Sequence, residues 1–147
     1  MGSLRLTISP DNDGTCLLHA EVSADGFSGI GHAWFDLKRL QSFAMDLEKY
    51  PLTSDPRVAI EGGFLSRNHP YKVEQRHLSI SVYPVNSRGV LGVQVYVSSP
   101  LHEQDRPESQ RVAQLELLTH YAELESFSAQ IRNMVLQQAG EAVLKSS

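Results

Sequence analysis

One eight-residue pattern occurs twice in the sequence, and it constrains the fold more than any other feature. Leu40 to Leu47 reads LQSFAMDL and Leu124 to Ile131 reads LESFSAQI, so that Phe43 and Phe127 lie 84 residues apart (127 − 43). Both copies have apolar residues at helical spacing, and an alternating, strand-like segment precedes each. The pattern predicts two related β-β-β-α units, about 1–51 and 52–140. Core packing alone could also produce such a match, so an internal duplication is one of two interpretations.

The first 35 residues have the period of three successive strands. Leu4 to Ile8 and Cys16 to Val22 each alternate apolar and polar residues, which is typical of half-buried strands. Asp25-Gly26 then supplies the positive φ angles of a tight hairpin turn, so a third strand should run from Phe27 to Phe35.

Two glycines, Gly29 and Gly31, lie on one face of this third strand. A face with so little side-chain volume allows a helix or another backbone to approach closely. Asp36 is a suitable N-cap for a following helix, which Pro51 should end.

The second half predicts a short strand at Val58 to Ile60, interrupted by Gly62-Gly63, and then a clear hairpin. The hairpin strands are expected at 78–83 and 91–97, joined by a turn at 86–89. Residues 112–135 fit either one long helix or a strand followed by a helix, and the repeat favours the second. The tail, 141–147, is expected to add one further helical turn.

The elements together predict one α+β domain spanning residues 1–147. We expect a mostly antiparallel sheet of six to seven strands with two helices packed side by side on one of its faces. Which sheet face the helices cover is left open by the pattern.

Composition excludes several classes of function. The net charge of −4 and the pI near 5.8 lack the basic character that phosphate-backbone binding needs, so nucleic acid is not an expected partner. Cys16 is the only cysteine, which rules out an intrachain disulfide and suits a reducing compartment. No apolar run approaches the ~20 residues of a membrane span, so a cytoplasmic protein without membrane contact is expected.

Motifs for catalysis or for a cofactor are not found. The glycines near residue 30 do not follow the order of a phosphate-binding loop, and Cys16 is expected to be an inert core thiol. No histidines have helical metal-ligand spacing. His19 and His32 flank the Asp25-Gly26 turn symmetrically, so the hairpin should place them opposite each other as a weak candidate metal site. We expect no enzyme activity and no cofactor.

Charged loops and aromatic residues point instead to a protein-binding surface. The stretch from Arg67 to His77 is basic, whereas Glu103, Asp105 and Glu108 make the later linker acidic. The candidate binding residues are Trp34, Arg67, His69, Lys72, Arg76, Tyr83 and Tyr96.

The segment F-x-G-x-x-x-x-W-x-D-x-x-x-L-x-x-F-A-x-x-L, from Phe27 to Leu47, resembles one found in small uncharacterised bacterial proteins. The late Y-x-x-L-x-x-F segment from Tyr121 to Phe127 extends the resemblance, which carries no catalytic residues over. Some small acidic bacterial proteins of this kind resemble immunity proteins, which neutralise a toxin. The leading hypothesis is thus a noncatalytic cytoplasmic protein-binding domain. The alternatives are a small-molecule or metal-binding protein, with a cavity between helices and sheet, and a structural homodimer that pairs strand edges.

Overall fold

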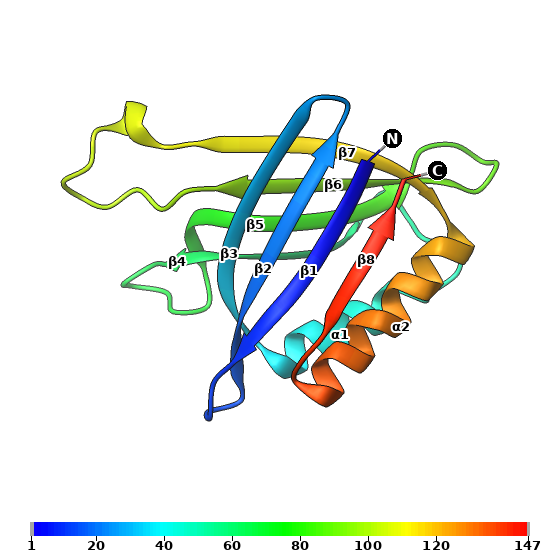
Figure 1. The fold of residues 1–147 in the computed structure, drawn as a ribbon, viewed down its shortest axis with the longest axis horizontal. Helices are drawn as coiled ribbons and strands as arrows, with labels where there is room; N and C mark the ends of the chain where they lie inside the picture. Colours follow the sequence, from blue (N-terminus) through cyan, green and yellow to red (C-terminus); the bar gives the residue numbers. More distant parts are fainter. Residues whose placement is uncertain (1, 147) are drawn as a thin grey trace.

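The computed structural model describes residues 2–146, which fold into eight strands and two α-helices (Figure 1). The elements, in chain order, are β1 (Gly2–Pro10), β2 (Thr15–Ala24), β3 (Phe27–Asp36), α1 (Leu37–Leu47), β4 (Val58–Leu65), β5 (Val73–Pro84), β6 (Val90–Ser98), β7 (Val112–His120), α2 (Tyr121–Gln137) and β8 (Glu141–Lys145). A short 3₁₀ turn, η1 (Pro107–Ser109), interrupts the loop between β6 and β7. The α+β class is therefore as expected from the sequence.

The strands form two antiparallel sheets of four, and not the single sheet of six to seven strands that we expected. Sheet A has the order β3-β2-β1-β8, and sheet B has the order β4-β5-β6-β7. The two sheets have the same topology when β7, β6, β5 and β4 are matched to β3, β2, β1 and β8. Each sheet consists of a three-strand meander and one added strand. The added strand follows the other half's helix: β4 follows α1 but pairs with β5, and β8 follows α2 but pairs with β1.

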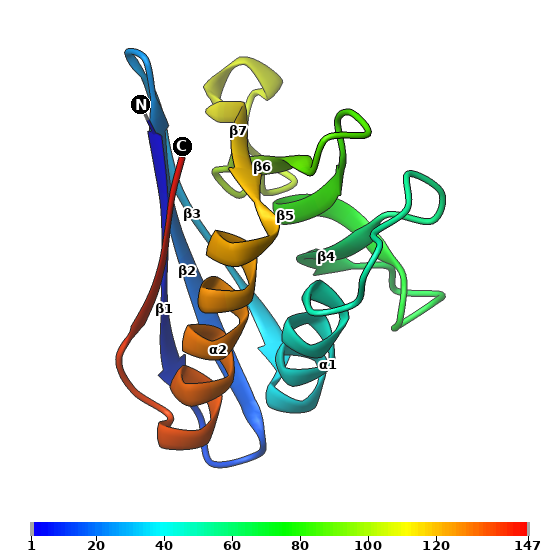
Figure 2. The same ribbon diagram turned by 90° about the vertical axis from the view of Figure 1, so that its right-hand side faces the viewer.

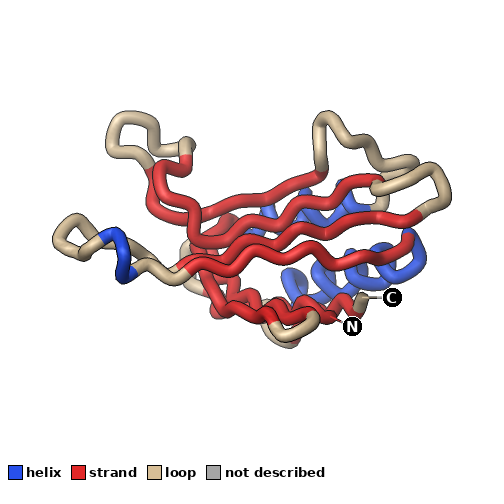
Figure 3. Tube along the Cα trace, turned by 90° about the horizontal axis from the view of Figure 1, so that it is seen from above, coloured by secondary structure: helices blue, strands red, loops and turns tan. Residues whose placement is uncertain are grey.

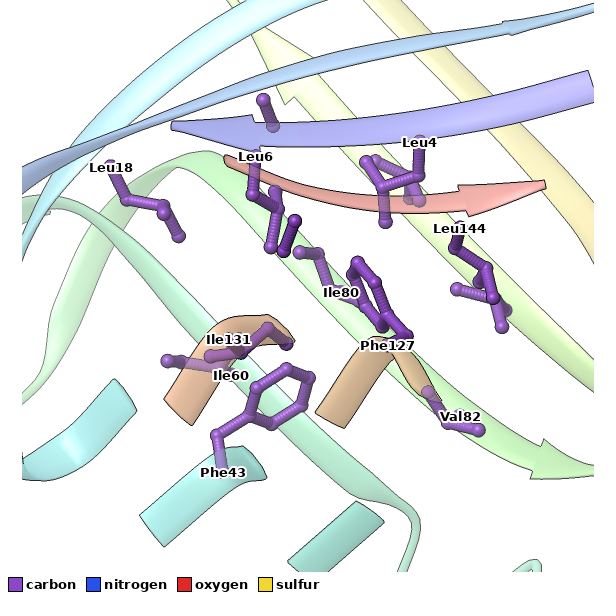
Figure 4. Close-up of a cluster of buried hydrophobic side chains, with 14 of the residues drawn as sticks. Leu4, Leu6, Leu18, Phe43, Ile60, Ile80, Val82, Phe127, Ile131 and Leu144 are labelled. Atoms are coloured by element: carbon purple, nitrogen blue, oxygen red, sulfur yellow. The ribbon is translucent and has the colours of Figure 1, made fainter. Parts of the chain in front are cut away.

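The two sheets cross at a steep angle, and the helices lie side by side between their diverging ends (Figure 2). The core fills this space with residues from every strand and from both helices. Figure 4 shows part of it, where Phe43 and Phe127 lie among residues of both sheets. The expectation that both helices cover one face of one sheet was wrong, since α1 packs on β3 and β4 while α2 packs mainly on β8 and β7. An amphipathic helix needs an apolar surface, which here comes from two sheets.

The repeated eight-residue pattern forms the contact between the helices. Phe43 and Phe127 are both buried, as expected of matched core residues. Ser128 Oγ donates a hydrogen bond of 2.6 Å to the carbonyl oxygen of Ala44, 84 residues away. Arg132 reaches Glu48 at 2.7 Å, again 84 residues away. Corresponding residues of the two helices therefore meet across a local axis.

The glycine face of β3 accommodates the other sheet. A Cβ added at Gly29 would lie 2.6 Å from the Cβ of Ala113 and 2.7 Å from Cγ2 of Val97, and one at Gly31 would lie 2.8 Å from the Cβ of Val97. The expected close approach of another backbone is confirmed, and β6 and β7 provide it.

Three local predictions can be compared with the structure. Strand β7 followed by α2 confirms the strand-then-helix interpretation of 112–135. Strand β4 continues through Gly62 and Gly63 with a shift of register, where we expected the strand to break. The tail forms β8 and not a helical turn, because Ala142 and Leu144 lie on the same face of the strand and are buried opposite Leu6 and Leu4 of β1.

Candidate functional site

Large apolar side chains are exposed along β3, on the face of sheet A that points away from the core. The side chain of Ile30 is 72% exposed and that of Trp34 is 57% exposed, with the exposed His32 between them. Ile30, His32 and Trp34 point to the same side because side chains two residues apart in a strand share a face. Neither apolar side chain is needed for the core, so this row is available for contact with another molecule.

Strand β3 is also the edge of its sheet. Asp25 (φ 52°) and Gly26 (φ 89°) have the positive φ angles of a type I′ turn, which makes Ala24 and Phe27 a hydrogen-bonded pair. Hydrogen-bonded and non-hydrogen-bonded pairs alternate from there, so the odd-numbered residues of β3 bond to β2. The N–H and C=O groups of Ser28, Ile30, His32 and Trp34 consequently point to the free edge.

Two grooves lie along this edge, one at each half of β3. The first, of 370 Å³, lies between Ser28 to Ile30 and the residues at which β6 ends and β7 begins, including Ser99 and Arg111. The second, of 580 Å³, lies between the end of β3 and the loop that joins β4 to β5. Its lining includes Trp34, Arg39, Gly63, Leu65 and Tyr71.

An aromatic cluster lies where β4 ends and β5 begins, near Gly31 in the middle of β3. The ring of Phe64 contacts His77 edge-on, with ring centroids 4.5 Å apart, and lies 5.5 Å from the ring of His102. The side-chain amide of Gln75 exchanges two hydrogen bonds of 2.8 Å with the backbone of Leu101. These bonds fix the loop after β6 against β5.

His77 is buried in this cluster. Its Nε2 lies 2.6 Å from Oε1 of Gln75, an amide oxygen that can only accept hydrogen bonds and also accepts one from Leu101 N–H, so His77 is the donor. Burial lowers the pKa of His77, and the nearby His32 and His102 lower it further.

The loop between β4 and β5 and the loop between β6 and β7 extend from the same end of sheet B (Figure 3). They differ in charge. The loop between β4 and β5 carries Arg67, His69 and Lys72, all exposed. Within residues 2–146, no carboxylate forms an ion pair with Arg39, Arg67, Lys72 or Arg111. The loop between β6 and β7 carries Glu103, Asp105 and Glu108, of which Glu108 pairs with Arg106 at 3.8 Å.

The seven predicted binding residues do not form one surface. Trp34 lies in the second groove, and Arg67, His69 and Lys72 lie on the loop beside it. Arg76 and Tyr96 are on the outer face of sheet B, where the guanidinium lies 3.8 Å from the ring centroid. Tyr83 is on that face too, buried.

Tyr83 is held by neighbours on β6, on β7 and in the loop just before β4. Its ring lies over Gly92, where an added Cβ would come within 2.5 Å of Cε2, and its hydroxyl donates a hydrogen bond to Glu116. Arg57 lies 3.8 Å above the ring. Burial and the bond to Glu116 raise the pKa of Tyr83 to about 12, so the hydroxyl keeps its proton.

His19 and His32 lie opposite each other across β2 and β3, as the hairpin symmetry predicted. Their ring centroids are 5.7 Å apart, and Nε2 of His19 is 3.3 Å from Oγ of Ser9. Among residues 2–146 we found no group of three or more His, Cys, Asp or Glu side chains placed to hold a metal ion. The pair alone does not define a metal site.

Cys16 lies on the inner face of β2 and is fully buried, as expected. Burial raises the pKa of its thiol to about 11, with a further contribution from Asp36. Because the thiolate is the reactive species, this thiol is unsuited to nucleophilic chemistry.

Sequence reasoning missed Ile30, Leu65 and Tyr71 as surface residues. Tyr71 is 99% exposed and lines the second groove. Ile30 could have been found, because it alternates in phase with Trp34 on the polar face of a predicted strand. Leu65 could not, because only the crossing of the sheets brings it near β3.

Comparison of the chain with protein-family models, with curated proteins and with solved structures found no match. Neither helix within the described residues has the length and apolar character needed to cross a bilayer. The function must therefore be argued from the site itself.

Proposed function

We propose that the protein is a noncatalytic protein-binding domain whose binding surface is the β3 edge with its two grooves. The observation that carries the proposal is the exposed row of Ile30, His32 and Trp34 beside grooves of 370 and 580 Å³. Exposed aromatic residues beside unpaired cations are typical of protein-binding surfaces.

The most specific form of this proposal is a cytoplasmic immunity protein that binds and neutralises a toxin. It is supported by the resemblance of Phe27 to Leu47 to small bacterial proteins and by the net charge of −4. A toxin encoded beside this gene would be the partner to test first.

The test is co-expression with the product of each neighbouring gene, followed by titration calorimetry of any purified complex. We expect Trp34→Ala to weaken binding about tenfold or more, as for a central aromatic contact. The matched control is Leu136→Ala, which removes an even more exposed apolar side chain, 77% exposed, from α2 and outside both grooves.

The proposal fails if Trp34→Ala and Leu136→Ala bind the partner as well as the unmodified protein does. For the immunity form, the partner alone should arrest growth, and co-expression of the unmodified protein should restore it. Equal rescue by the Trp34→Ala and Leu136→Ala variants would show that the partner binds elsewhere.

We also propose that the chain arose by duplication of a β-β-β-α-β unit, with halves of 2–65 and 73–145 and not 1–51 and 52–140. The matching strand orders and the helix contacts between residues 84 apart support this proposal. The unit ends with the strand after each helix, which the sequence pattern did not include.

A further inference from the structure

We infer that the partner supplies an extended segment that adds to β3 as a fifth strand of sheet A, with an acidic end beside the loop 66–72. The inference rests on the proposed function and specifies how the partner is recognised. It follows from the hydrogen-bonding state of β3, the shape beside it and the charges at its ends.

The backbone of β3 is prepared for strand addition. Ser28, Ile30, His32 and Trp34 direct their N–H and C=O groups to the free edge, and within residues 2–146 β3 pairs with β2 alone. Their spacing of two residues is the repeat with which an added strand forms its ladder. The same residues bear the exposed side chains, so an added strand would bond to their backbone and lie beside their side chains.

We call the surface beside the free edge of β3, which includes the two grooves, the trough, and the part of sheet B that lies under it the floor. The ends of β5, β6 and β7, together with their loops, extend past β3 beneath its free edge (Figure 1). The two grooves are the ends of this trough, and the Phe64, His77 and His102 rings lie near its middle. An added strand would direct alternate side chains to the floor, where Leu65, Val112 and Phe64 are exposed. The segment should therefore have apolar residues at every second position.

The charges around Trp34 favour a negative charge on the part of the partner segment that would lie there. Arg39 lines that groove, and Arg67 and Lys72 are on the adjacent loop, all without an ion pair within residues 2–146. Asp36 is the one carboxylate among the groove-lining residues. At the other end Arg111 lines the groove, but the loop after β6 adds Glu103, Asp105 and Glu108, of which Glu108 pairs with Arg106. That end is therefore less favourable to an acidic residue. An acidic end is thus favoured near Trp34.

The floor also disfavours a second copy of this chain as the occupant. If β3 paired with β3 of a second copy about a two-fold axis, the floors of both copies would lie under the same pair of strands. The two floors would then overlap. A single extended segment needs only the width of one strand, about 4.8 Å. The trough therefore suits a thin partner segment better than a whole second domain.

The experiment uses 12-residue peptides selected from a random display library on the immobilised full-length protein. Selected sequences should alternate apolar residues and carry Asp or Glu at one end. A fluorescein-labelled selected peptide is then titrated against the variants by fluorescence anisotropy.

The key variant is Ile30→Pro, which removes one edge-directed N–H without removing a bond to β2. We expect it to weaken binding about tenfold, since one hydrogen bond and the fit of the edge are lost. Ile30→Thr keeps the N–H and a β-branched side chain, and should cost less than about threefold. Lys72→Glu should weaken the acidic peptide and spare a version with Asn and Gln in place of Asp and Glu.

Hydrogen exchange on the unmodified protein tests the same inference without any risk of misfolding. Saturating peptide should slow exchange of the amides of Ile30, His32 and Trp34. Unchanged exchange at these amides, equal binding by Ile30→Pro, or the failure of any peptide to be selected would each overturn strand addition. The proposed function would stand through any of these outcomes if a folded partner still requires Trp34.

Discussion

The two sheets have the same topology, but their outer faces differ. On sheet B the aromatic side chains are covered: Arg57 lies 3.8 Å from the ring centroid of Tyr83, and Arg76 lies equally close to Tyr96. On sheet A, Trp34 and Ile30 remain exposed. A shared interior thus leaves each outer face free to differ, and the uncovered aromatic of sheet A marks the side on which contact with a partner is expected.

The largest effect is expected where the interiors of the two halves differ. Gly31 of β3 corresponds to Leu115 of β7, 84 residues later, and only the glycine leaves room for the crossing. Gly31→Val would force a side chain into Val97 and the carbonyl oxygen of His77, 3.2 Å from the added Cβ, and we expect a loss of about 3 kcal/mol or more in urea unfolding. The exposed neighbour change Ile30→Val is the control, and equal stability of both variants would contradict the close crossing.

A smaller loss is expected on the covered face of sheet B. Tyr83→Phe removes the hydroxyl that donates to Glu116, and the free energy of unfolding should fall by about 1–2 kcal/mol. Because the pKa of Tyr83 is raised to about 12 from its ordinary 10, its contribution is complete below pH 10 and is lost as the pH rises towards 12. Tyr71→Phe, on a fully exposed side chain, should leave stability unchanged at every pH. Identical alkaline unfolding of the two variants would argue against the buried hydroxyl.

Acid should weaken the fold near the point where the sheets cross. The pKa of His77 is lowered, so the unfolded chain takes up a proton first, and stability is lost as the pH falls below about 6.5. Gln75 and Phe64 contact the ring, and His32 and His102 are the titratable neighbours. His77→Gln should therefore flatten the decline in Tm between pH 7 and pH 5. His69→Gln, in the exposed loop, should reproduce the unmodified profile, and a profile equally steep in both variants would exclude His77 as the source.

The smallest effect is expected on the open face of sheet A. Trp34→Ala should change the free energy of unfolding by no more than about 0.5 kcal/mol, since this side chain lies mostly in solvent. Urea titration followed by circular dichroism measures the change. A loss comparable to that of Tyr83→Phe would mean that Trp34 belongs to the fold, and that the two outer faces are alike.

Local structure was largely readable from the sequence. The Asp25-Gly26 turn, the opposition of His19 and His32 and the strand before α2 all follow from residue chemistry and period. The division into two sheets did not, because a half-buried strand has the same alternation whichever sheet it joins. Strand β8 was missed because five residues after Gly140 give too short a pattern to separate from a helical turn.

The candidate site was harder to predict than the fold. Trp34 and the basic stretch from Arg67 to His77 stand out in the sequence. Tyr83 and Tyr96 carry the same aromatic signal, but they lie under arginines. Whether an aromatic residue on a strand is covered depends on residues far away in the sequence, such as Arg57 above Tyr83. The alternation of apolar and polar residues along a strand does not predict such neighbours. Tyr71 and Leu65 become neighbours of β3 only through the tertiary fold.

Strand β8 pairs with β1 although more than 130 residues separate them, with Leu4 opposite Leu144 and Leu6 opposite Ala142. A ribosome therefore exposes β1, β2 and β3 long before the strand that completes their sheet exists. Until then Leu4 and Leu6 lack one of their neighbours, whereas sheet B can assemble from a continuous stretch of chain. Non-local pairing of this kind slows folding. The order of assembly should thus be sheet B first, with sheet A closing last.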